Sequence, residues 1–237
     1  MPTPLASKGT TRRERLRADL IAQIKAVAVA QLEAAGPAGV SLRGIAREVG
    51  VSPAALYGYF DSLDDLFTAL IVDAFNDIAD AVESAVAAQP PDALGERLWA
   101  GIRAYRAWAL ANPSLFRLLY FSPVPGYEPP DEGEALTAAL RVFVPMLATM
   151  LEGYERGLMK PPPSGPHIDA SKFREYFGLD LTPDQLALST KCWTEFHGFV
   201  ALEINGHIDP HWVDAAALFA ANVRSSIREM GLPLDDG

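Results

Sequence analysis

Residues 41–66 read SLRGIAREVGVSPAALYGYFDSLDDL, and this stretch decides how the rest of the chain is interpreted. Ser41 and Ser52 are residues of the kind that cap a helix N-terminus, and the proline after Ser52 suits the first helical position. Between them, Gly50 stands where a helix can end and a left-handed residue is tolerated. The pattern predicts two short helices joined by a tight turn, a helix-turn-helix over about residues 41–60.

On both sides of this stretch, apolar residues recur with helical rather than strand spacing. A stripe of leucine, isoleucine and valine from Leu16 to Leu32 predicts a first helix. Ser62 and Asp65 resemble a capping box, so they predict the start of a long helix that runs to about Ala88.

The second half of the chain is predicted to add enough helices to give about nine in all and no convincing strand, which makes the fold class all-α. Pro145 should kink its helix or mark the start of it. The segment KPPPSGPH, residues 160–167, is a stiff linker within a connection of roughly 22 residues, which is unusually long. The helices expected here start after the break at residues 89–92 and at Asn112, and then cover 134–158, 182–205 and 209–230.

The second helix of the predicted helix-turn-helix presents side chains that suit a DNA groove. Small residues such as Ala54 and Ala55 allow close approach to thymine methyl groups, and tyrosine hydroxyls can reach phosphates or base edges. Arg43 can bond to guanine or to a phosphate. The alternative is a helical hairpin packed inside an ordinary bundle, but such a hairpin would carry apolar residues at these positions. The candidate DNA contacts are Arg12, Arg13, Ser41, Arg43, Ser52, Ala54, Ala55, Tyr57 and Tyr59.

Charge is divided unevenly along the chain. The net charge is −10, yet residues 1–60 hold eight basic and four acidic side chains, a balance of +4 that leaves −14 for the rest. This asymmetry indicates a basic module that meets phosphate and an acidic remainder that does not. A chance fluctuation in a short segment would produce the same numbers, so charge alone does not decide.

The spacing within residues 41–66 resembles the DNA-binding signature of the TetR family of bacterial repressors. In that signature, fixed spacings separate a hydroxyl residue, Ile-Ala, Gly-Val-Ser, Leu-Tyr and Phe. The resemblance covers about residues 11–75 and implies a three-helix DNA-binding domain. It further implies that residues 76–231 form a larger helical domain that binds a ligand and dimerises. The matching positions are Ser41, Ile45, Ala46, Gly50, Val51, Ser52, Leu56, Tyr57 and Phe60.

One position departs from the family pattern. The family usually has a lysine three residues after the phenylalanine, at the start of the next helix, where a phosphate is bound. Here that position is Leu63, followed by Asp64 and Asp65. The helix N-terminus still favours an anion, and the arginine-rich arm that includes Arg12 and Arg13 can supply the missing charge.

Aromatic and methionine residues gather on the middle helices, where they can line an apolar pocket or fill a core. A later stretch, residues 193–207, resembles the Trp-x-x-x-His-Gly-x-x-x-Leu-Glu pattern in a subgroup of TetR-like C-terminal domains. His197 within it is a candidate ligand contact or a hydrogen-bonded core histidine. The candidate ligand-binding residues are Trp99, Arg103, Tyr105, Trp108, Phe116, Tyr120, Phe143, Met146, Met150, Trp193 and His197.

The two last predicted helices have more to bury than a single core. Phe199 and Leu202 lie off the main apolar stripe of their helix, and the last helix is rich in small residues at 215–223. Two such helices from each of two subunits can form a four-helix interface. We therefore expect a homodimer through residues 182–230.

Other chemistry finds no support in the sequence. Glu203, His207 and His211 have metal-ligand spacing, but Asp209 and Pro210 break the helix between the histidines, so no metal site is expected. No catalytic motif, phosphate-binding glycine loop or dinucleotide fingerprint is present, and we expect neither an enzyme nor a cofactor. The lone Cys192 fits a reducing cytoplasm. We expect neither a secretory signal nor a membrane span.

The function expected from these features is a ligand-responsive transcriptional regulator, a repressor that binds a palindromic operator as a homodimer. A small apolar or amphipathic effector would release it from double-stranded DNA. The alternative is a helical small-molecule or partner-binding module whose helix-turn-helix binds DNA weakly or not at all. Leu63 and the acidic pair after it keep this alternative open.

Overall fold

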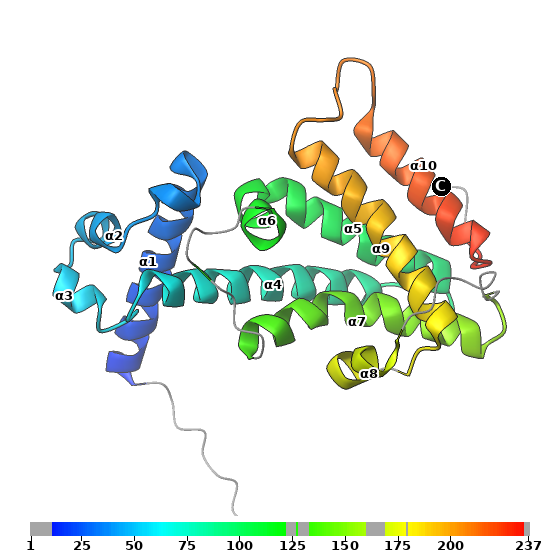
Figure 1. Cartoon of the computed structure of the whole chain (residues 1–237), viewed down its shortest axis with the longest axis horizontal. Coiled ribbons are helices and arrows are strands. Elements are labelled where there is room, and N and C mark those ends of the chain that lie inside the picture. The colour runs from blue at the N-terminus through cyan, green and yellow to red at the C-terminus, as the bar shows by residue number, and fades with distance from the viewer. Residues whose placement is uncertain (1–10, 122–126, 128–132, 160–168, 179, 235–237) are drawn as a thin grey trace, which may run out of the picture.

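The computed structural model describes residues 11–121, 127, 133–159, 169–178 and 180–234, and this part of the chain contains ten α-helices, one 3₁₀ turn and no strand. The N-terminal helices gather at one end of the molecule, and α4 runs from there into the larger group of helices (Figure 1). These elements are α1 (Arg12–Ala35), the 3₁₀ turn (Pro37–Gly39), α2 (Leu42–Val49), α3 (Pro53–Leu56) and α4 (Leu63–Ala87).

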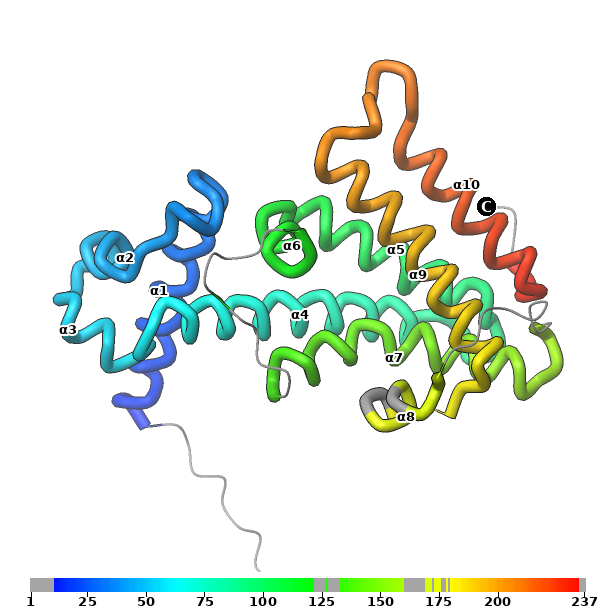
Figure 2. The backbone as a smooth tube through the Cα atoms, in the orientation of Figure 1, coloured from blue at the N-terminus to red at the C-terminus, as the bar shows by residue number. Residues whose placement is uncertain are grey.

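The remaining helices build the larger end of the molecule around α4. Helix α7 lies along α4 and α5, while α9 and α10 form an antiparallel hairpin on the other side of α5 (Figure 2). The short α6 packs against α1, α4 and α5. These helices are α5 (Leu94–Ala111), α6 (Pro113–Tyr120), α7 (Glu134–Glu155), α8 (Ser171–Phe177), α9 (Pro183–Ile204) and α10 (Ala215–Glu229).

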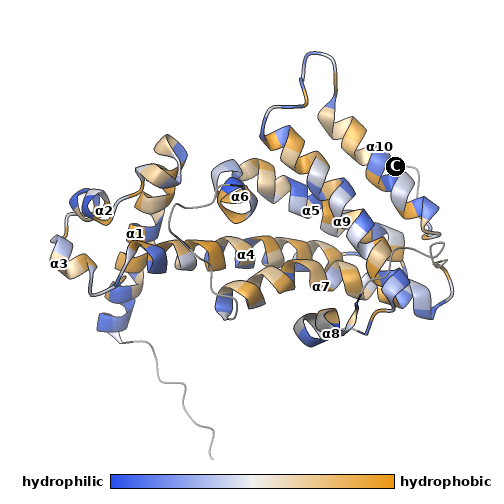
Figure 3. Ribbon diagram, viewed as in Figure 1, coloured by the Kyte–Doolittle hydropathy of each residue, from blue (hydrophilic) through white to orange (hydrophobic). Residues whose placement is uncertain are grey.

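Hydrophobic residues concentrate on α4 and α7, the two long helices at the centre of the bundle (Figure 3). Ile78 and Val82 of α4 and Val142 of α7 are completely buried. Among the described helices, α7 alone is long and apolar enough to cross a membrane by length and composition. It packs along α4 and α5, and 33 % of its apolar window is buried in the described structure.

Side-chain caps hold the N-terminal helices in place, as the sequence predicts. Ser41 Oγ accepts a hydrogen bond from the Gly44 amide, and Ser52 Oγ accepts one from the Ala55 amide, each at 3.1 Å. The chain turns between α2 and α3 at Gly50, whose φ of 79° is left-handed. A capping box that was not predicted, between Thr11 and Glu14, starts α1.

The contact between α1 and α2 needs a glycine. A Cβ atom on Gly44 would lie 2.8 Å from Ser41 Oγ and 3.1 Å from Gln31 Nε2. Gln31 of α1 also accepts a hydrogen bond from the Ser41 amide and donates one to Glu48 at 2.7 Å. Gly44 therefore lets α2 approach α1 closely enough for this polar contact.

Pro145 lies inside α7, which confirms a helix through this region and excludes the proline as its start; the buried Val142 and Met146 on either side keep the helix packed. Two other expectations about the helices are wrong. The last helix begins at Ala215, where the Asp214 carboxylate caps it, and not at 209. The connection before α9 contains a tenth helix, α8, started by the Asp169 carboxylate, which accepts from the Ser171 amide. Residues 160–167, the expected linker, lie outside the described residues.

Two smaller differences concern the helix-turn-helix domain. Helix α3 ends at Leu56, and tight i→i+3 bonds from Gly58 and Tyr59 continue the chain as turns rather than as a helix through residue 60. Leu16, placed on the apolar stripe, is 59 % exposed, because α1 extends beyond the helices that cover it.

Candidate functional site

The exposed surface of α3 and the turn after it is small and polar. Ser52, Ala54 and Ala55 are exposed, and the Tyr57 side chain beside them is 48 % exposed. Leu56 and Phe60, on the opposite side, are buried in the core. The sequence thus separates a core face from a face that is free to approach a DNA groove.

Tyr57 and Tyr59 lie in different environments. Tyr59 is half-buried against the core, and the guanidinium of Arg17 lies 4.8 Å from its ring centroid. Arg43 on α2 is exposed, as are Arg12 and Arg13 in the first turn of α1. The structure therefore leaves Tyr57 and these arginines at the surface, while Tyr59 joins the packing of α1 against the helix-turn-helix.

The start of α4 carries no cation in the position where the family has lysine. Leu63 instead packs partly buried against the core. The Asp65 carboxylate accepts a hydrogen bond from the Ser62 amide at 3.1 Å, and Ser62 Oγ caps the Asp65 amide. The N-terminus of α4 is thus satisfied by its own side chains and by an acidic first turn.

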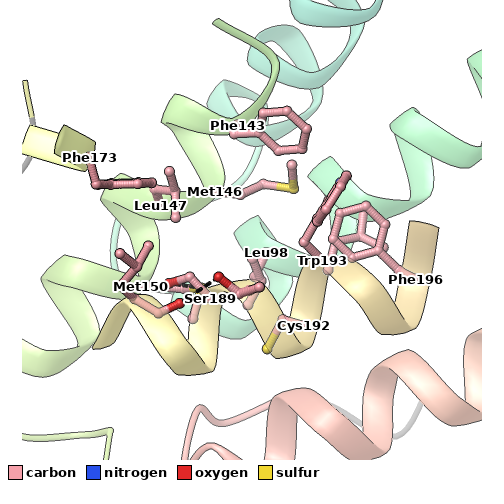
Figure 4. Close-up of a pocket in the computed structure, with 13 residues that line it drawn as sticks. Leu98, Phe143, Met146, Leu147, Met150, Phe173, Ser189, Cys192, Trp193 and Phe196 are labelled. Atoms are coloured by element: carbon pink, nitrogen blue, oxygen red, sulfur yellow. Dashed lines mark hydrogen bonds between the residues drawn. The ribbon is translucent and has the colours of Figure 1, made fainter. Parts of the chain in front are cut away.

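A second feature lies in the larger end of the molecule, where a cavity of about 230 Å³ opens between α5, α7, α8 and α9. Figure 4 shows aromatic and sulfur-containing side chains around it, with Phe143 and Met146 from α7 facing Trp193 and Phe196 from α9. The lining residues are Leu98, Ile102, Phe143, Met146, Leu147, Met150, Phe173, Leu186, Ser189, Thr190, Cys192, Trp193 and Phe196.

The hydroxyl groups in this wall are already engaged. The Ser189 hydroxyl donates to the Gln185 carbonyl, and the Thr190 hydroxyl donates to the Leu186 carbonyl, each at 2.9 Å. Burial raises the pKa of the Cys192 thiol to about 12, so it is protonated at neutral pH. The described lining of the cavity is therefore neutral.

Next to the cavity, His197 is the centre of an aromatic cluster. Its ring stacks on Trp193 of the cavity wall at 5.0 Å and on Phe121 at 5.7 Å, and it meets the edge of Tyr120 at 4.7 Å. His197 Nδ1 and the Tyr105 hydroxyl lie 2.8 Å apart. Burial lowers the pKa of His197 and raises that of Tyr105, so this pair is neutral.

Helix α6 links this cluster to the DNA-binding end. Tyr120 and Phe116 belong to α6 and pack around His197, while α6 also contacts α1. Arg117 of α6 donates to the Ile204 carbonyl at 2.6 Å and to Asn205 Oδ1 at 3.1 Å, at the end of α9. One short helix thus touches α1, the His197 cluster and the last turn of α9.

The structure distributes the predicted ligand residues over several places. Phe143, Met146, Met150 and Trp193 line the cavity. Tyr105, Phe116, Tyr120 and His197 form the neighbouring aromatic cluster instead. The other three lie apart: Trp99 packs on Phe219, Trp108 is partly buried against the core, and Arg103 is exposed.

Sequence reasoning missed several lining residues, chiefly those from α8 and the first half of α9. Leu186 and Ser189 follow Thr182 and Pro183 at helical spacing, a signal that placed them on a helix but not beside α7. Two local signals do mark the helix that carries Phe173. Asp169 and Ser171 mark its start, and the left-handed Gly178 marks its end.

The hairpin of α9 and α10 leaves an apolar surface. Phe199, which was expected on an outer face, is partly buried and packs on Phe219 within the chain at 5.3 Å. Leu202 and Leu218 are 51 % and 41 % exposed, and Trp212 in the connecting loop is 82 % exposed. Glu203 is held by Arg106 at 2.5 Å and 2.8 Å, and the described residues contain no metal-binding group.

Both parts of the chain match models of known protein families. Residues 24–70 match the model of bacterial regulatory proteins of the tetR family, and residues 98–225 match the tetracyclin repressor-like C-terminal domain. The chain belongs to the TetR family. It is 36% identical over 220 residues to the HTH-type transcriptional regulator Rv1816 of Mycobacterium tuberculosis H37Rv, covering 90% of this chain and 93% of that protein.

Solved structures share the fold of this TetR-family regulator. The crystal structure of the putative regulatory protein SCO4313 superposes with a TM-score of 0.74 at 30% identity, over 94% of this chain and all of that one. RolR, in complex with resorcinol, has the same fold at 16% identity, with a TM-score of 0.52 over 92% of this chain and 91% of its own. The chain is therefore a helix-turn-helix transcriptional regulator of this family.

Proposed function

We propose that the protein is a ligand-responsive repressor that binds a palindromic operator as a homodimer and is released by an effector. In this proposal residues 11–75 read DNA, and residues 76–231 bind the effector and dimerise. The observation that carries it is the pairing of two sites in one chain. Tyr57 and Arg43 are exposed at one end, and a neutral cavity opens at the other.

Dimerisation is supported by the α9–α10 hairpin. Leu202 and Leu218 are large apolar side chains left in water, and their burial against a second copy is favourable at about 25 cal/mol per Å². Small exposed residues of α10, such as Ala217 and Ala221, allow close helix contact. A twofold dimer through residues 182–230 would set two recognition helices about 34–36 Å apart.

Release by an effector is supported by the position of Trp193. This side chain lines the cavity and also stacks on His197, which packs against α6. A ligand that displaces Trp193 would therefore move the His197 cluster and, through α6, the contact with α1. A coupling of about 1–3 kcal/mol is sufficient to change operator affinity 5- to 150-fold.

A second candidate function is a helical binding module with weak or no DNA affinity. Leu63 and the acidic first turn of α4 favour it, since both remove phosphate attraction at a position where the family has a cation. Under either function we propose a cytoplasmic protein without enzymatic activity. The regulators that it resembles, and RolR with its bound resorcinol, support the first candidate.

The deciding experiment is selection of bound fragments from genomic DNA, followed by gel-shift titration at several salt concentrations. We expect a steep loss of affinity with added salt, as phosphate neutralisation requires. Tyr57→Ala should weaken operator binding about tenfold, a typical loss for one base or phosphate contact. Leu110→Ala, at an exposed position on α5, is the control and should bind as the wild type does. Unchanged affinity in Tyr57→Ala, or binding that ignores salt, contradicts the proposal.

A further inference from the structure

The walls of the cavity between α5, α7, α8 and α9 define the kind of molecule that fits there. We propose that the effector is an uncharged, predominantly apolar molecule about the size of two fused rings, and that the cavity rejects carboxylates. This inference rests on the proposed function, in which an effector occupies the cavity.

The charge of the ligand follows from the lining. The described lining residues include no lysine, arginine, histidine, aspartate or glutamate. An anion that entered would lose its hydration shell without gaining a cation, and such desolvation is strongly unfavourable. A neutral ligand loses nothing comparable.

Hydrogen-bonding capacity is equally restricted. The hydroxyl hydrogens of Ser189 and Thr190 are used within α9, and the Cys192 thiol lies 3.3 Å from the sulfur of Met230. The Trp193 indole N–H is buried without a partner among the described residues, which leaves at most one donor in the wall. A polyol, nucleoside or sugar would therefore leave most of its polar groups unsatisfied.

The size and shape of the ligand follow from the volume and the aromatic rings. An engineered cavity of about 150 Å³ binds benzene, so a cavity of about 230 Å³ accommodates a second ring. Phe143 and Trp193 meet edge to face at 6.0 Å and 90° on one side, an arrangement that can be extended by a further aromatic ring. Met146 and Met150 are flexible side chains that can adjust to its outline.

The test compares naphthalene with 1-naphthoate by calorimetric titration of the full chain at pH 7.5. These probes share a ring system and differ in one carboxylate. We expect naphthalene to bind with one site per chain and 1-naphthoate to bind at least 100-fold more weakly. Thr190 is the exposed member of the lining, so Thr190→Lys can place a cation at the cavity without burying it. This variant should reduce the ratio of the naphthalene affinity to the 1-naphthoate affinity at least tenfold, whereas the neutral control Thr190→Val should leave that ratio unchanged.

Several results would overturn the inference. The inference fails if the affinity for 1-naphthoate is within tenfold of the affinity for naphthalene, or if naphthalene does not bind. It also fails if Ser189→Phe leaves the affinity for naphthalene unchanged. Ser189→Phe is designed to fill the cavity, and the Thr190 pair serves if that variant does not fold. A gel shift with the selected operator separates this inference from the proposed function. If naphthalene binds and the operator DNA stays bound, the inferred ligand class is supported, but the proposed release of DNA by the effector is contradicted. If only a carboxylate releases DNA, the ligand class fails and the repressor function stands.

Discussion

The two ends of this molecule use aromatic residues in opposite ways. At the DNA-binding end, Tyr57 is half exposed and contributes little to the core, while the Ser52 cap and the buried Leu56 position it. At the end that contains the cavity, Tyr105 and Phe116 are completely buried, and the same rings that hold the helices together also shape the surroundings of the cavity. A substitution at the DNA-binding end can therefore change binding with little loss of folding stability, whereas a substitution of the buried rings near the cavity changes both.

The largest expected effect is at the end that contains the cavity. Phe116→Ala removes a buried ring that packs against Tyr105 and Tyr120, and should lower the free energy of unfolding by about 3–5 kcal/mol. Urea denaturation measures it. The control is Phe121→Ala, whose ring stacks on His197 but is 44 % exposed, and which should cost about 1 kcal/mol or less. Equal losses in the two variants would show that burial of the Phe116 ring does not determine its contribution to stability.

The next effect concerns the arm at the DNA-binding end. A double variant, Arg12→Ala with Arg13→Ala, should bind the operator about tenfold more weakly, and its salt dependence should fall by up to about two counterions. Its stability should stay within about 0.5 kcal/mol of the wild type, since both side chains are exposed. Gel-shift titrations at several salt concentrations measure this, with Arg103→Ala on α5 as the control. An unchanged salt dependence would show that the arm does not contact phosphate.

A smaller gain is expected at the start of α4. Leu63→Lys restores the cation that the family carries there and should raise operator affinity about two- to fivefold, with a salt dependence steeper by about one counterion. Leu63→Met keeps the volume without the charge and should leave affinity unchanged. If the lysine variant binds the operator no better than the methionine variant, residue 63 does not lie close to a DNA phosphate.

The smallest effect is the pH dependence of His197. Burial lowers its pKa in the folded chain, so the unfolded chain binds a proton more readily than the folded one below pH of about 6.5. The contribution of His197 to the free energy of unfolding is therefore complete above that pH. It is lost as the pH falls toward the lower pKa that His197 has in the folded chain. His197→Phe should therefore lose less stability than the wild type between pH 7.5 and 5.5, as measured by thermal unfolding. Parallel losses would contradict a buried neutral histidine.

The difference between the ends also explains what the sequence could predict. Caps at Ser41, Ser52 and Ser62 and the turn at Gly50 are local signals, readable within a few residues, and the structure confirms each of them. Tyr59 is one exception at this end, because its ring packs against the core and lies next to Arg17, which is far away in sequence.

The cavity depends on long-range packing that no local pattern encodes. The aromatic content of α5, α6 and α7 predicted a pocket or a core, and the structure contains both side by side. Trp193 lines the cavity, but Tyr105 on a neighbouring helix does not. That division depends on which helices lie next to each other, and the unpredicted α8 supplies part of the wall through Phe173.

Helix α4 gives the two ends a common geometry. It begins at Leu63, beside the recognition elements, and ends at Ala87 within the larger bundle, as one uninterrupted helix. At about 1.5 Å per residue it is about 37 Å long. A rigid rod of that length, tilted by about 5° at its far end, carries its near end through about 3 Å, close to the 3.4 Å step between stacked base pairs. A rotation no larger than ordinary helix repacking is therefore enough to shift a recognition helix by one base pair.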